Sequence, residues 1–349
     1  MSKRGWQDKK VGSGKNVAVV IGRFSPFHNG HLHVVETAAA ENDYLVIVFG
    51  SARQARTFKS PWSDNNRVAM INQCFTERFG DKVQIRFAGV QDHYNDYHWE
   101  KDVVNKVIAA ASLQPGDNVT LYGYEKDTSS YYLRMFQQAY EGVHWSFKAV
   151  DSVDNMHATD IRHLIFTEEK AGLKKCQGSL PETVYEYLQH NWLGSAEFAA
   201  MQKEYLFMQQ YQEQFKGLKY APTFLTVDTV IIAQRSVLLI RRKEMPGEGL
   251  WSLPGSFVGQ HERLQEAAIR TAKQKAGIKL TEQQLIRSCY MDKPNRSLRG
   301  RTLTHAFLFE LEKQPGSSKG EWHPISNIDV LEGHMFEDHV QIIERLCFN

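Results

Sequence analysis

The first half of the chain alternates short apolar runs with stretches of helical periodicity, and this alternation restricts the fold more than any other feature. The apolar runs are VAVVIG at 17–22, YLVIVFGS at 44–51, KVQIRFAG at 82–89, NVTLYGY at 118–124 and HWSFKAV at 144–150. Stretches with helical spacing of apolar residues lie between them, at 30–43, 67–80 and 131–142. Alternating strands and helices predict an α/β fold with a doubly wound parallel sheet, whose ligands bind at the carboxyl ends of the strands.

The alternation ends near Ser179, and a different pattern follows. Residues 181–194 and 196–218 are expected to be helical, and Pro222 precedes a new series of strands. These strands lie at 223–233, 236–243, 288–292 and 302–311, with helices at 263–277 and at the C-terminus. They predict a mixed α+β module. The expected division is a flexible tail at 1–15, a first domain at 16–192, a helical linker at 193–220 and a second domain at 221–349.

The composition excludes several classes of protein. With 42 Lys and Arg against 40 Asp and Glu, the formal charge of the 349 residues is only +2, so no field favours a nucleic-acid partner. The four cysteines are widely scattered and form no CxxC pair, which fits a reducing compartment. No apolar run approaches the roughly 18–20 residues that span a bilayer. We therefore expect a cytoplasmic protein that has neither a membrane nor a nucleic acid as partner.

The run GRFSPFHNGHLH, Gly22–His33, follows the first predicted strand directly and opens a helix. A helix N-terminus offers a phosphate its unpaired N–H groups and the positive end of the helix dipole. Gly22 and Gly30 let the backbone approach a ligand, and His28 and His31 lie three positions apart. Imidazole N–H groups can donate hydrogen bonds to a triphosphate and to the charge that develops as it breaks. The sequence therefore predicts a phosphate site here.

This run resembles the (H/T)xGH signature of nucleotidylyltransferases, in the version found in nicotinamide-mononucleotide adenylyltransferases. The family's second signature, an ISxTxIR-like string at a helix start, resembles NMHATDIR at 155–162, although Met156 and His157 depart from it. The resemblance covers most of residues 16–165 and implies a Rossmann-like domain. The residues that it implies as catalytic are His28, His31 and Arg162.

The resemblance implies transfer of AMP from ATP to nicotinamide mononucleotide, which gives NAD and pyrophosphate. The attacking 5′-phosphate needs no protein base, because its second pKa of about 6 leaves it mostly ionised at neutral pH. The protein has to position two polyanions and neutralise their charge, a task that suits His, Arg, Lys, N–H groups and Mg²⁺. We therefore expect ATP and nicotinamide mononucleotide as substrates, with Mg²⁺ bound to the ATP.

Three further segments, at 50–67, 90–99 and 123–136, resemble those that build the mononucleotide pocket in this family. They suggest Trp62 and Trp99 as aromatic faces for the nicotinamide ring, because a ring face attracts a cation. From the residues alone, core packing is an equal alternative for each tryptophan. The predicted substrate-binding residues are Gly22, Arg23, Phe24, Gly30, Trp62, Arg67, Trp99, Lys126, Asp127 and Thr159.

The second module resembles a Nudix hydrolase, and the whole chain resembles the bifunctional proteins that join the adenylyltransferase to a Nudix ADP-ribose pyrophosphatase. The Nudix box runs Gly, five residues, Glu, seven residues, then Arg-Glu-apolar-x-Glu-Glu-x-Gly. Placing Glu262 on the first glutamate puts Arg270 and Gly277 in register. The first box glycine then falls on Ser256, and the three helix glutamates fall on Thr271, Gln274 and Lys275.

These departures bear on the metal chemistry that the resemblance implies. Hydrolysis in this family uses divalent ions held by the helix glutamates, and the three replacements change the formal charge there from −3 to +1. We therefore expect weak or absent hydrolysis. Glu262 and Glu266, one helical turn apart, form a weak candidate metal site, and a solvated helix face is the favoured alternative.

The ligand-binding part of the module departs less from the family. Met291–Phe307 resembles the substrate segment of the ADP-ribose-specific members, and guanidinium groups suit a forked contact with a pyrophosphate. The residues predicted to bind this ligand are Trp251, Arg296, Arg299 and Arg301, with core packing as an equal alternative for Trp251. The module is therefore expected to bind ADP-ribose, NAD or a related dinucleotide. It would act as a sensor, or as a structural and homo-oligomerisation partner of the first domain.

Three alternatives stay open at this point. The first is a fully bifunctional enzyme that also hydrolyses ADP-ribose to AMP and ribose 5-phosphate. The second is a nucleotidylyltransferase for another small phosphate, such as phosphopantetheine or a sugar phosphate. The third is a regulator in which both domains only bind ligands, which the matching His28, His31 and Arg162 disfavour.

Overall fold

The chain folds into two compact units in a computed structural model that describes residues 14–348, apart from 43, 126–127, 137–138 and 154–156. The first unit takes in the chain up to Ala52 and then Trp62–Asn191. The second unit takes in Arg53–Pro61 and Trp192–Asn349. Within the described residues, no helix is long and apolar enough to cross a membrane.

The first unit is built on a six-stranded sheet in the order β3-β2-β1-β4-β6-β5. Its strands are β1 (Asn16–Gly22), β2 (Tyr44–Phe49), β3 (Gln84–Gly89), β4 (Asn118–Gly123), β5 (Ala139–Tyr140) and β6 (Val143–Ala149). All neighbours pair in parallel except β5 with β6. The central strands read as unbroken apolar runs because helices cover both faces of a parallel sheet. The predicted doubly wound sheet is therefore confirmed.

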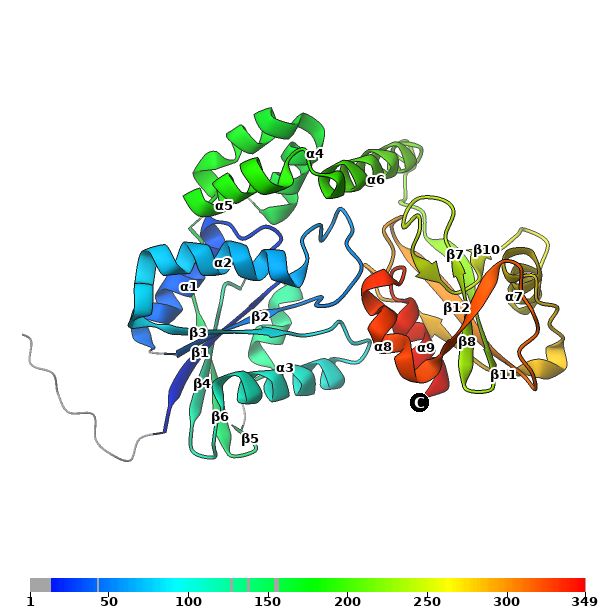
Figure 1. Cartoon of the computed structure of the whole chain (residues 1–349), viewed down its shortest axis with the longest axis horizontal. Helices are drawn as coiled ribbons and strands as arrows, with labels where there is room; N and C mark the ends of the chain where they lie inside the picture. The colour runs from blue at the N-terminus through cyan, green and yellow to red at the C-terminus, as the bar shows by residue number, and fades with distance from the viewer. Residues whose placement is uncertain (1–13, 43, 126–127, 137–138, 154–156, 349) are drawn as a thin grey trace, which may run out of the picture. The chain divides into compact units, whose positions relative to one another are not determined.

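Helices flank this sheet on both sides, with α1 and α2 on one side and α3 on the other (Figure 1). Val103, Val104 and Val107 of α3 pack with valines of β1 and β2 in one core cluster. The helices of the first unit are α1 (Asn29–Glu41), α2 (Asp64–Phe79), α3 (Asp96–Ala111), α4 (Ala158–Lys175) and α5 (Glu182–Tyr187).

The carboxyl ends of β1 and β4 mark the point where the strand order reverses. From β1 the chain continues to β2 on one side, whereas β4 lies on the other side. A ligand crevice forms at such a point, because the connections leave in opposite directions. The run Gly22–His33 begins here, at the end of β1 and the start of α1.

One predicted helix of the first unit is wrong. The described residues of 131–142 form no α-helix: a short 3₁₀ segment ends at Arg134, and β5 then pairs with β6 as a hairpin. Glu141 and Gly142 lie between the paired strands with φ of 50° and 80°. Two successive positive φ values are what the tight hairpin turn requires, and glycine supplies one of them without strain.

The second unit contains a mixed sheet in the order β11-β12-β7-β8-β13, with β10 beside β7 and β9 beside β8. The strands are β7 (Phe224–Ala233), β8 (Ser236–Arg241), β9 (Trp251–Ser252), β10 (Gly255–Phe257), β11 (Leu285–Met291), β12 (Thr302–Leu311) and β13 (Gly320–Pro324). The helices are α6 (Ala196–Glu213), α7 (Leu264–Thr271), α8 (Ile328–Leu331) and α9 (His339–Cys347). Because β7 and β12 pair in parallel and the other pairs are antiparallel, the predicted α+β module is confirmed.

The core of the second unit explains the small residues of its box helix. Ala267 and Ala268 of α7, with Ala272 and Ala276 of the π-helical turn that follows, pack on apolar side chains of β7, β8 and β12. Short side chains let the helix approach the sheet closely. The chain then turns at Gly277, whose φ of 73° favours glycine.

The helix α6 belongs to the second unit, where the sequence predicts a separate linker at 193–220. The Glu204 carboxylate accepts a hydrogen bond of 2.8 Å from the Gly247 N–H. Tyr211 and Phe215 pack their rings against Phe224 at the start of β7. These contacts attach α6 to the module that follows it.

Candidate functional site

His28 and His31 are held in one defined protonation pattern at the start of α1. His28 caps the helix, and its Nδ1 accepts a hydrogen bond of 3.1 Å from the Gly30 N–H. The His31 Nδ1 accepts one of 3.3 Å from the His28 N–H. Because each neutral ring uses Nδ1 as an acceptor, its proton resides on Nε2. The two rings, with centroids 3.8 Å apart, therefore offer two Nε2–H donors from one place.

His31 is kept neutral by its surroundings. Its ring lies edge-on to Phe24 at 5.0 Å and stacks on Phe27 at 5.8 Å. Burial, reinforced by the neighbouring His28, lowers the pKa of His31 well below its usual value. At neutral pH the ring is consequently an uncharged donor.

The loop after β1 also explains the glycine at position 22. Phe24 is buried and has a φ of 49°, and a Cβ at Gly22 would lie 2.9 Å from the Phe24 ring.

The second signature reaches the first one through Arg162. This residue lies in the first turns of α4, and its guanidinium donates hydrogen bonds to the Ser25 carbonyl and, at 3.2 Å, to the Thr159 hydroxyl. Ser25 belongs to the loop between β1 and α1. The structure thus brings the loop of His28 and His31 together with Thr159 and Arg162, from segments more than a hundred residues apart.

Two predicted substrate contacts lie instead in the protein interior. Trp62 is 2% exposed and Arg67 is 1% exposed. The Arg67 guanidinium donates to the carbonyls of Arg23 at 2.8 Å and Gly50 at 2.9 Å, and to the Asp64 carboxylate at 2.6 Å. These acceptors occupy most of its donors. The placement favours a structural role, in which Arg67 fixes the loops that follow β1 and β2.

The remaining predicted residues of the first unit differ in their exposure. Trp99 is half-buried, with its ring 5.8 Å from those of Tyr132 and Phe136, so part of it is accessible to a ligand. Arg23 is exposed. Lys126 and Asp127 lie outside the described residues.

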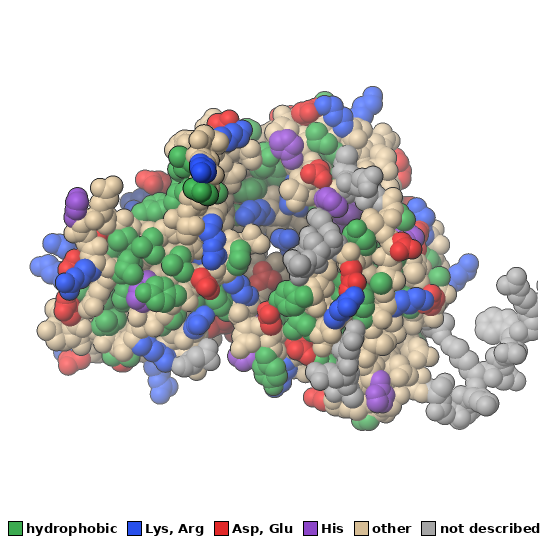
Figure 2. Space-filling view, turned by 180° about the vertical axis from the view of Figure 1, so that it is seen from behind, with side chains coloured by type: hydrophobic (Ala, Val, Ile, Leu, Met, Phe, Trp, Pro, Cys, Tyr) green, Lys and Arg blue, Asp and Glu red, His purple; other side chains and the backbone are tan. Residues whose placement is uncertain are grey.

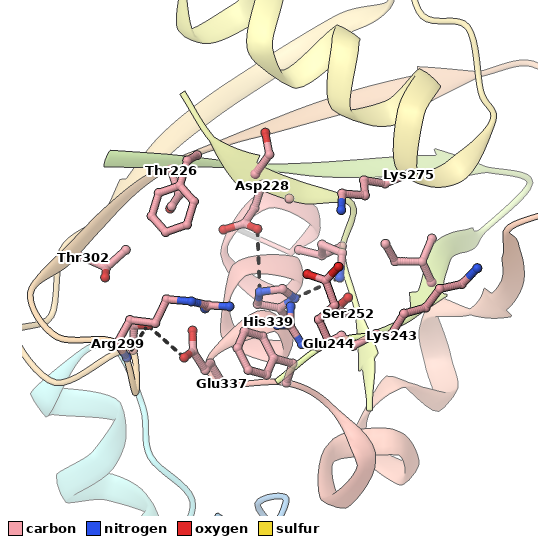
Figure 3. Close-up of a pocket in the computed structure, with 18 of the residues that line it drawn as sticks. Thr226, Asp228, Lys243, Glu244, Ser252, Lys275, Arg299, Thr302, Glu337 and His339 are labelled. Carbon is pink, nitrogen blue, oxygen red and sulfur yellow. Dashed lines mark hydrogen bonds and ion pairs between the residues drawn. The ribbon is translucent and has the colours of Figure 1, made fainter. Parts of the chain in front are cut away.

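The second unit contains a pocket of about 440 Å³, shown in Figure 3. Two of the predicted ligand-binding residues, Arg296 and Arg299, line it. The other two are absent from the lining among the described residues. The Arg301 guanidinium donates to the Asp292 carbonyl. Trp251 is buried, and the Arg241 guanidinium lies 3.7 Å from the centre of its indole ring. The core-packing alternative for Trp251 is therefore favoured.

Two of the four box positions that depart from the Nudix pattern contact each other. The hydroxyls of Ser256 and Thr271 are hydrogen-bonded at 2.7 Å, and Thr271 is fully buried. In the box these two positions are a glycine and a metal-binding glutamate. The space next to the helix is thus filled by a hydroxyl pair, which offers a hard divalent cation no carboxylate.

Glu262 and Glu266 are not arranged as a cation site, contrary to the weak prediction. Glu262 receives hydrogen bonds of 2.6 and 2.7 Å from Arg270 and one of 2.7 Å from the Gly259 N–H. These bonds, that from Arg270 first, lower the pKa of Glu262 to about 2. Glu266 accepts from the Arg263 N–H at the start of α7. Among the described residues, no group of three or more His, Cys, Asp or Glu side chains could hold a metal.

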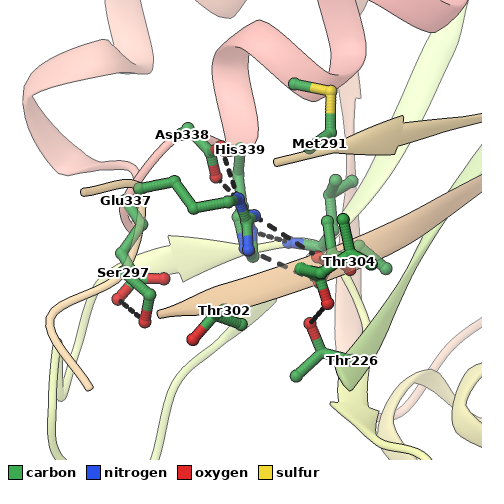
Figure 4. Close-up of polar contacts among 12 residues, drawn as sticks. Thr226, Met291, Ser297, Thr302, Thr304, Glu337, Asp338 and His339 are labelled. Atoms are coloured by element: carbon green, nitrogen blue, oxygen red, sulfur yellow. Dashed lines mark hydrogen bonds and ion pairs between the residues drawn. The ribbon is translucent and has the colours of Figure 1, made fainter. Parts of the chain in front are cut away.

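A buried polar network that the sequence does not predict lies beside the pocket. Asp228 accepts a hydrogen bond of 2.8 Å from Thr304 and lies 3.8 Å from Arg296, which also forms a two-pronged pair with Asp338 (Figure 4). The His339 Nδ1 accepts from the Leu253 N–H, and its Nε2 lies 3.7 Å from Asp228. A carboxylate inside the apolar strand β7 was the signal that could have revealed this network.

Burial governs the charges of this network. It raises the pKa of Asp228 despite the nearby Arg296, and it lowers the pKa of His339 to about 3. His339 is therefore neutral at physiological pH, with its Nε2–H directed at Asp228.

Comparisons with known proteins identify both units. Residues 19–163 match the cytidylyltransferase-like family, and residues 222–346 match the NUDIX domain. A nicotinamide/nicotinic acid mononucleotide adenylyltransferase from Acinetobacter baylyi is 32% identical over 171 residues, which are 49% of this chain and 83% of that protein.

The whole chain is similar to a solved structure that contains both units. A bifunctional NMN adenylyltransferase/ADP ribose pyrophosphatase from Francisella tularensis has a TM-score of 0.80 and 27% identity, over 95% of this chain and 98% of that one. The same protein complexed with AMP and a manganese ion has a TM-score of 0.79, with the same identity and coverage. The chain therefore belongs to the nicotinamide-mononucleotide adenylyltransferase family, and its second unit is a NUDIX domain.

Proposed function

We propose that the first unit transfers the AMP moiety of ATP to nicotinamide mononucleotide, giving NAD and pyrophosphate. The observation that carries this proposal is that Arg162 binds the Ser25 carbonyl in the loop at the carboxyl end of β1, the loop that leads into His28 and His31. This is where a parallel sheet binds nucleotides, at the N-terminus of the following helix.

The reaction requires positioning and charge neutralisation. An oxygen of the mononucleotide 5′-phosphate attacks the α-phosphorus of ATP, the new P–O bond forms, and the bond from that phosphorus to the β-phosphate oxygen breaks. The electron pair leaves with pyrophosphate. Because the attacking phosphate is already mostly a dianion at neutral pH, with a second pKa of about 6, no protein base is required. The two neutral imidazoles and Arg162 donate to the phosphate oxygens on which negative charge increases.

The metal ion enters this scheme as part of the substrate. The related Francisella tularensis protein was solved with AMP and a manganese ion, which supports a divalent cation in the nucleotide chemistry of this family. We propose that Mg²⁺ arrives as the ATP complex and neutralises charge on the triphosphate. Thr159 would contact the phosphates, Gly22 and Gly30 would let the backbone approach them, and Arg23 and Phe24 would shape the loop around them.

The nicotinamide ring is assigned to Trp99. This indole is half-buried, so it retains a face for a pyridinium, whereas Trp62 lies in the core. Lys126 and Asp127 stay part of the predicted mononucleotide pocket. Arg67 is assigned the support of the loops.

For the second unit we propose binding of ADP-ribose, NAD or a related dinucleotide, with weak or absent hydrolysis. The residues that would hold a hydrolytic cation do not fit one, because Ser256 is hydrogen-bonded to Thr271 and Glu262 is paired with Arg270.

The proposed division of the chain is the one predicted from the sequence, except that α6 is assigned to the second unit. A cytoplasmic location and the absence of a nucleic-acid partner complete the proposal. On the face shown in Figure 2, Lys and Arg are interspersed with Asp and Glu over each unit, as the net charge of +2 suggests.

A chromatographic time course tests both halves. Purified full-length protein with ATP, Mg²⁺ and nicotinamide mononucleotide is expected to form NAD and pyrophosphate in equal amounts. The same preparation with ADP-ribose and Mg²⁺ or Mn²⁺ is expected to release little or no AMP. Absence of NAD would contradict the first proposal, and AMP release that disappears in Glu262→Gln would show a working hydrolase.

The identity of the second substrate is tested with Trp99→Ala. If Trp99 stacks on the nicotinamide ring, this variant raises the KM for the mononucleotide and leaves the KM for ATP unchanged. An unchanged KM for the mononucleotide would contradict the assignment. Preference for another small phosphate substrate in the wild-type protein would favour a different nucleotidylyltransferase.

A further inference from the structure

The pocket of the second unit carries more positive than negative side chains. Seven lysines and arginines line it, against three carboxylates, among the described residues. A pocket walled by protein concentrates the field of such an excess more than an open surface does. The net field in the pocket depends on how many of these charges are neutralised within the protein.

The carboxylates of the pocket neutralise little of this charge. Asp228 and Glu337 line it, but burial raises the pKa of both. Asp228 faces Arg296, which is already committed to its two-pronged pair with Asp338. Glu337 accepts hydrogen bonds from the Ser297 hydroxyl and the Leu298 N–H. Arg296 is thus a buried structural cation, and the other basic side chains face the cavity without an equal number of negative partners.

Arg242 and Arg299, both in the lining of the pocket, lie against the same aromatic ring. Arg242 stacks on Phe336 at 3.7 Å, and Arg299 lies 5.8 Å from the same ring. The pKa of Arg242 is lowered to about 10 by burial and by the charge of Arg299. Within the part of the chain that the structure describes, the half-buried Arg299 guanidinium donates no hydrogen bond. Two guanidinium groups held this close favour an anion between them.

Lys275 faces this pair from the end of the box helix. Figure 3 shows Lys275 and Arg299 on opposite sides of the pocket. Lys275 is exposed, and no described carboxylate pairs with its ammonium. Lys319, also in the lining, donates to the Gln274 carbonyl at 2.9 Å, which brings a second ammonium to the same helix end. The box pattern places glutamates at 274 and 275. In this chain the Lys275 ammonium and the Lys319 ammonium, which is bonded to the Gln274 carbonyl, lie there instead.

We infer that this pocket is a metal-independent site for a diphosphate, in which the Lys275 and Lys319 ammonium groups take the place of the divalent cation and Arg299 grips the anion from the other side. The inference rests on the proposed binding role of the second unit, and it adds the means of binding. The shared chemistry is the diphosphate group, either free as pyrophosphate or as the diester inside a dinucleotide.

This arrangement predicts the opposite metal dependence from a Nudix hydrolase. A carboxylate-lined site needs Mg²⁺ between protein and diphosphate, so a chelator abolishes binding there. The lysine-lined pocket binds the bare anion. Because Mg²⁺ in solution competes for the same phosphate oxygens, added Mg²⁺ weakens binding or leaves it unchanged.

Isothermal titration calorimetry of the full-length protein with ADP-ribose, in EDTA and in Mg²⁺, tests the inference. We expect binding in EDTA that is no weaker than in Mg²⁺. Lys275→Gln is expected to weaken it by about tenfold, which corresponds to about 1.4 kcal/mol for one charged contact. Lys273→Gln is the matched control, since Lys273 is exposed on the same π-helical turn and does not line the pocket. A parallel titration with inorganic pyrophosphate separates the two sources of the diphosphate.

The outcomes are distinct. Binding that requires Mg²⁺, or equal affinities for the Lys275→Gln and Lys273→Gln proteins, overturns the inference. Absence of binding by both ADP-ribose and pyrophosphate in EDTA overturns it as well. Because pyrophosphate is also a product of the proposed reaction of the first unit, only binding that depends on Lys275 is assigned to this pocket. NAD formation by Lys275→Gln, measured on the same preparation, reports separately on the first unit.

Discussion

The two signature helices of this chain, α1 and α7, differ in the hydrogen-bond partners of their polar side chains. At the start of α1, the Nδ1 atoms of His28 and His31 accept hydrogen bonds within the loop, so each ring carries its proton on Nε2. In α7 and its box, Glu262 is bound to Arg270, and Thr271 is bound to Ser256. The polar side chains of the second signature are thus paired with one another, whereas those of the first are bonded to backbone N–H groups and keep a defined tautomer. A signature therefore indicates its chemistry only when its side chains keep the bonding that this chemistry needs.

The largest expected effect tests the availability of His31. His31→Ala removes one Nε2–H donor aimed at the phosphates, and loss of one such donor lowers kcat by about 10²–10³-fold. The measurement is the initial rate of NAD formation at saturating ATP and mononucleotide. His144→Ala, an exposed histidine on β6, is the control and is expected to keep the wild-type rate. An unchanged kcat in His31→Ala would mean that the signature of α1, like that of α7, does not contribute to catalysis.

A second prediction concerns Arg67, which the sequence suggests as a binding residue and the structure places in the interior. Arg67→Ala leaves the Arg23 and Gly50 carbonyls and the Asp64 carboxylate without their donor. We expect a loss of about 3 kcal/mol in the unfolding free energy, because removing one partner leaves buried polar groups unpaired. Arg78→Ala, in the same helix, breaks only an exposed pair with Glu36 and should cost less than about 1 kcal/mol.

Thermal and urea unfolding measure the stability of the two variants. The KM of Arg67→Ala for the mononucleotide then decides whether Arg67 supports the loops or binds the substrate. If Arg67 is a support, the folded fraction of Arg67→Ala keeps its KM for the mononucleotide within a small factor. Wild-type stability together with a raised KM would return Arg67 to the binding site.

The sequence predicts the fold of both units and the place of the first site, because these depend on local periodicity and on motif spacing. It does not predict the burial of Trp62 and Arg67, because an aromatic or a guanidinium group in a loop segment suits a ligand and a core equally well. The hairpin at 139–144 is missed for a related reason: the apolar spacing of 131–142 fits a helix, and only the turn at Glu141 and Gly142 decides otherwise. The contact between Ser256 and Thr271 joins positions fifteen residues apart, and only the three-dimensional fold reveals it.

A third prediction tests whether the second helix can be returned to the pattern of a metal site. Thr271→Glu alone places a larger, charged side chain in a buried position next to Ser256, and it should destabilise the protein by about 2 kcal/mol. Lys275→Glu, at an exposed position, is the control and should change stability by less than about 0.5 kcal/mol.

The combination Ser256→Gly, Thr271→Glu, Gln274→Glu and Lys275→Glu removes the hydroxyl pair and supplies the carboxylates of the box. We expect this protein to bind Mn²⁺ in calorimetry and the wild-type second unit not to bind it. Equal Mn²⁺ binding by the wild type, assigned to this unit because Glu262→Gln abolishes it, would show that the hydroxyl pair does not exclude the cation.

The smallest expected effect concerns the pH dependence of stability in the second unit. The pKa of His339 is about 3 in the folded protein, against an unfolded value of about 6.5. As pH falls from about 6.5 toward 3, the unfolded chain binds a proton that the folded chain does not, so stability is lost on acidification, by at most about 1.4 kcal/mol per pH unit. The charged groups that face His339 are Asp228, Asp338, Arg296, Arg242 and Arg299, so a variant is compared with the wild type at each pH.

His339→Gln removes the titrating ring, so the difference in unfolding free energy between wild type and variant should shrink as pH is lowered from 7 to 5. Urea unfolding at several pH values measures this difference, and His334→Gln, in the short segment before α9, is the histidine control. A constant difference would mean that His339 takes up its proton in the folded state. Its Nε2 would then form an ion pair with Asp228, and the second unit would hold a charged histidine, unlike the neutral pair of α1.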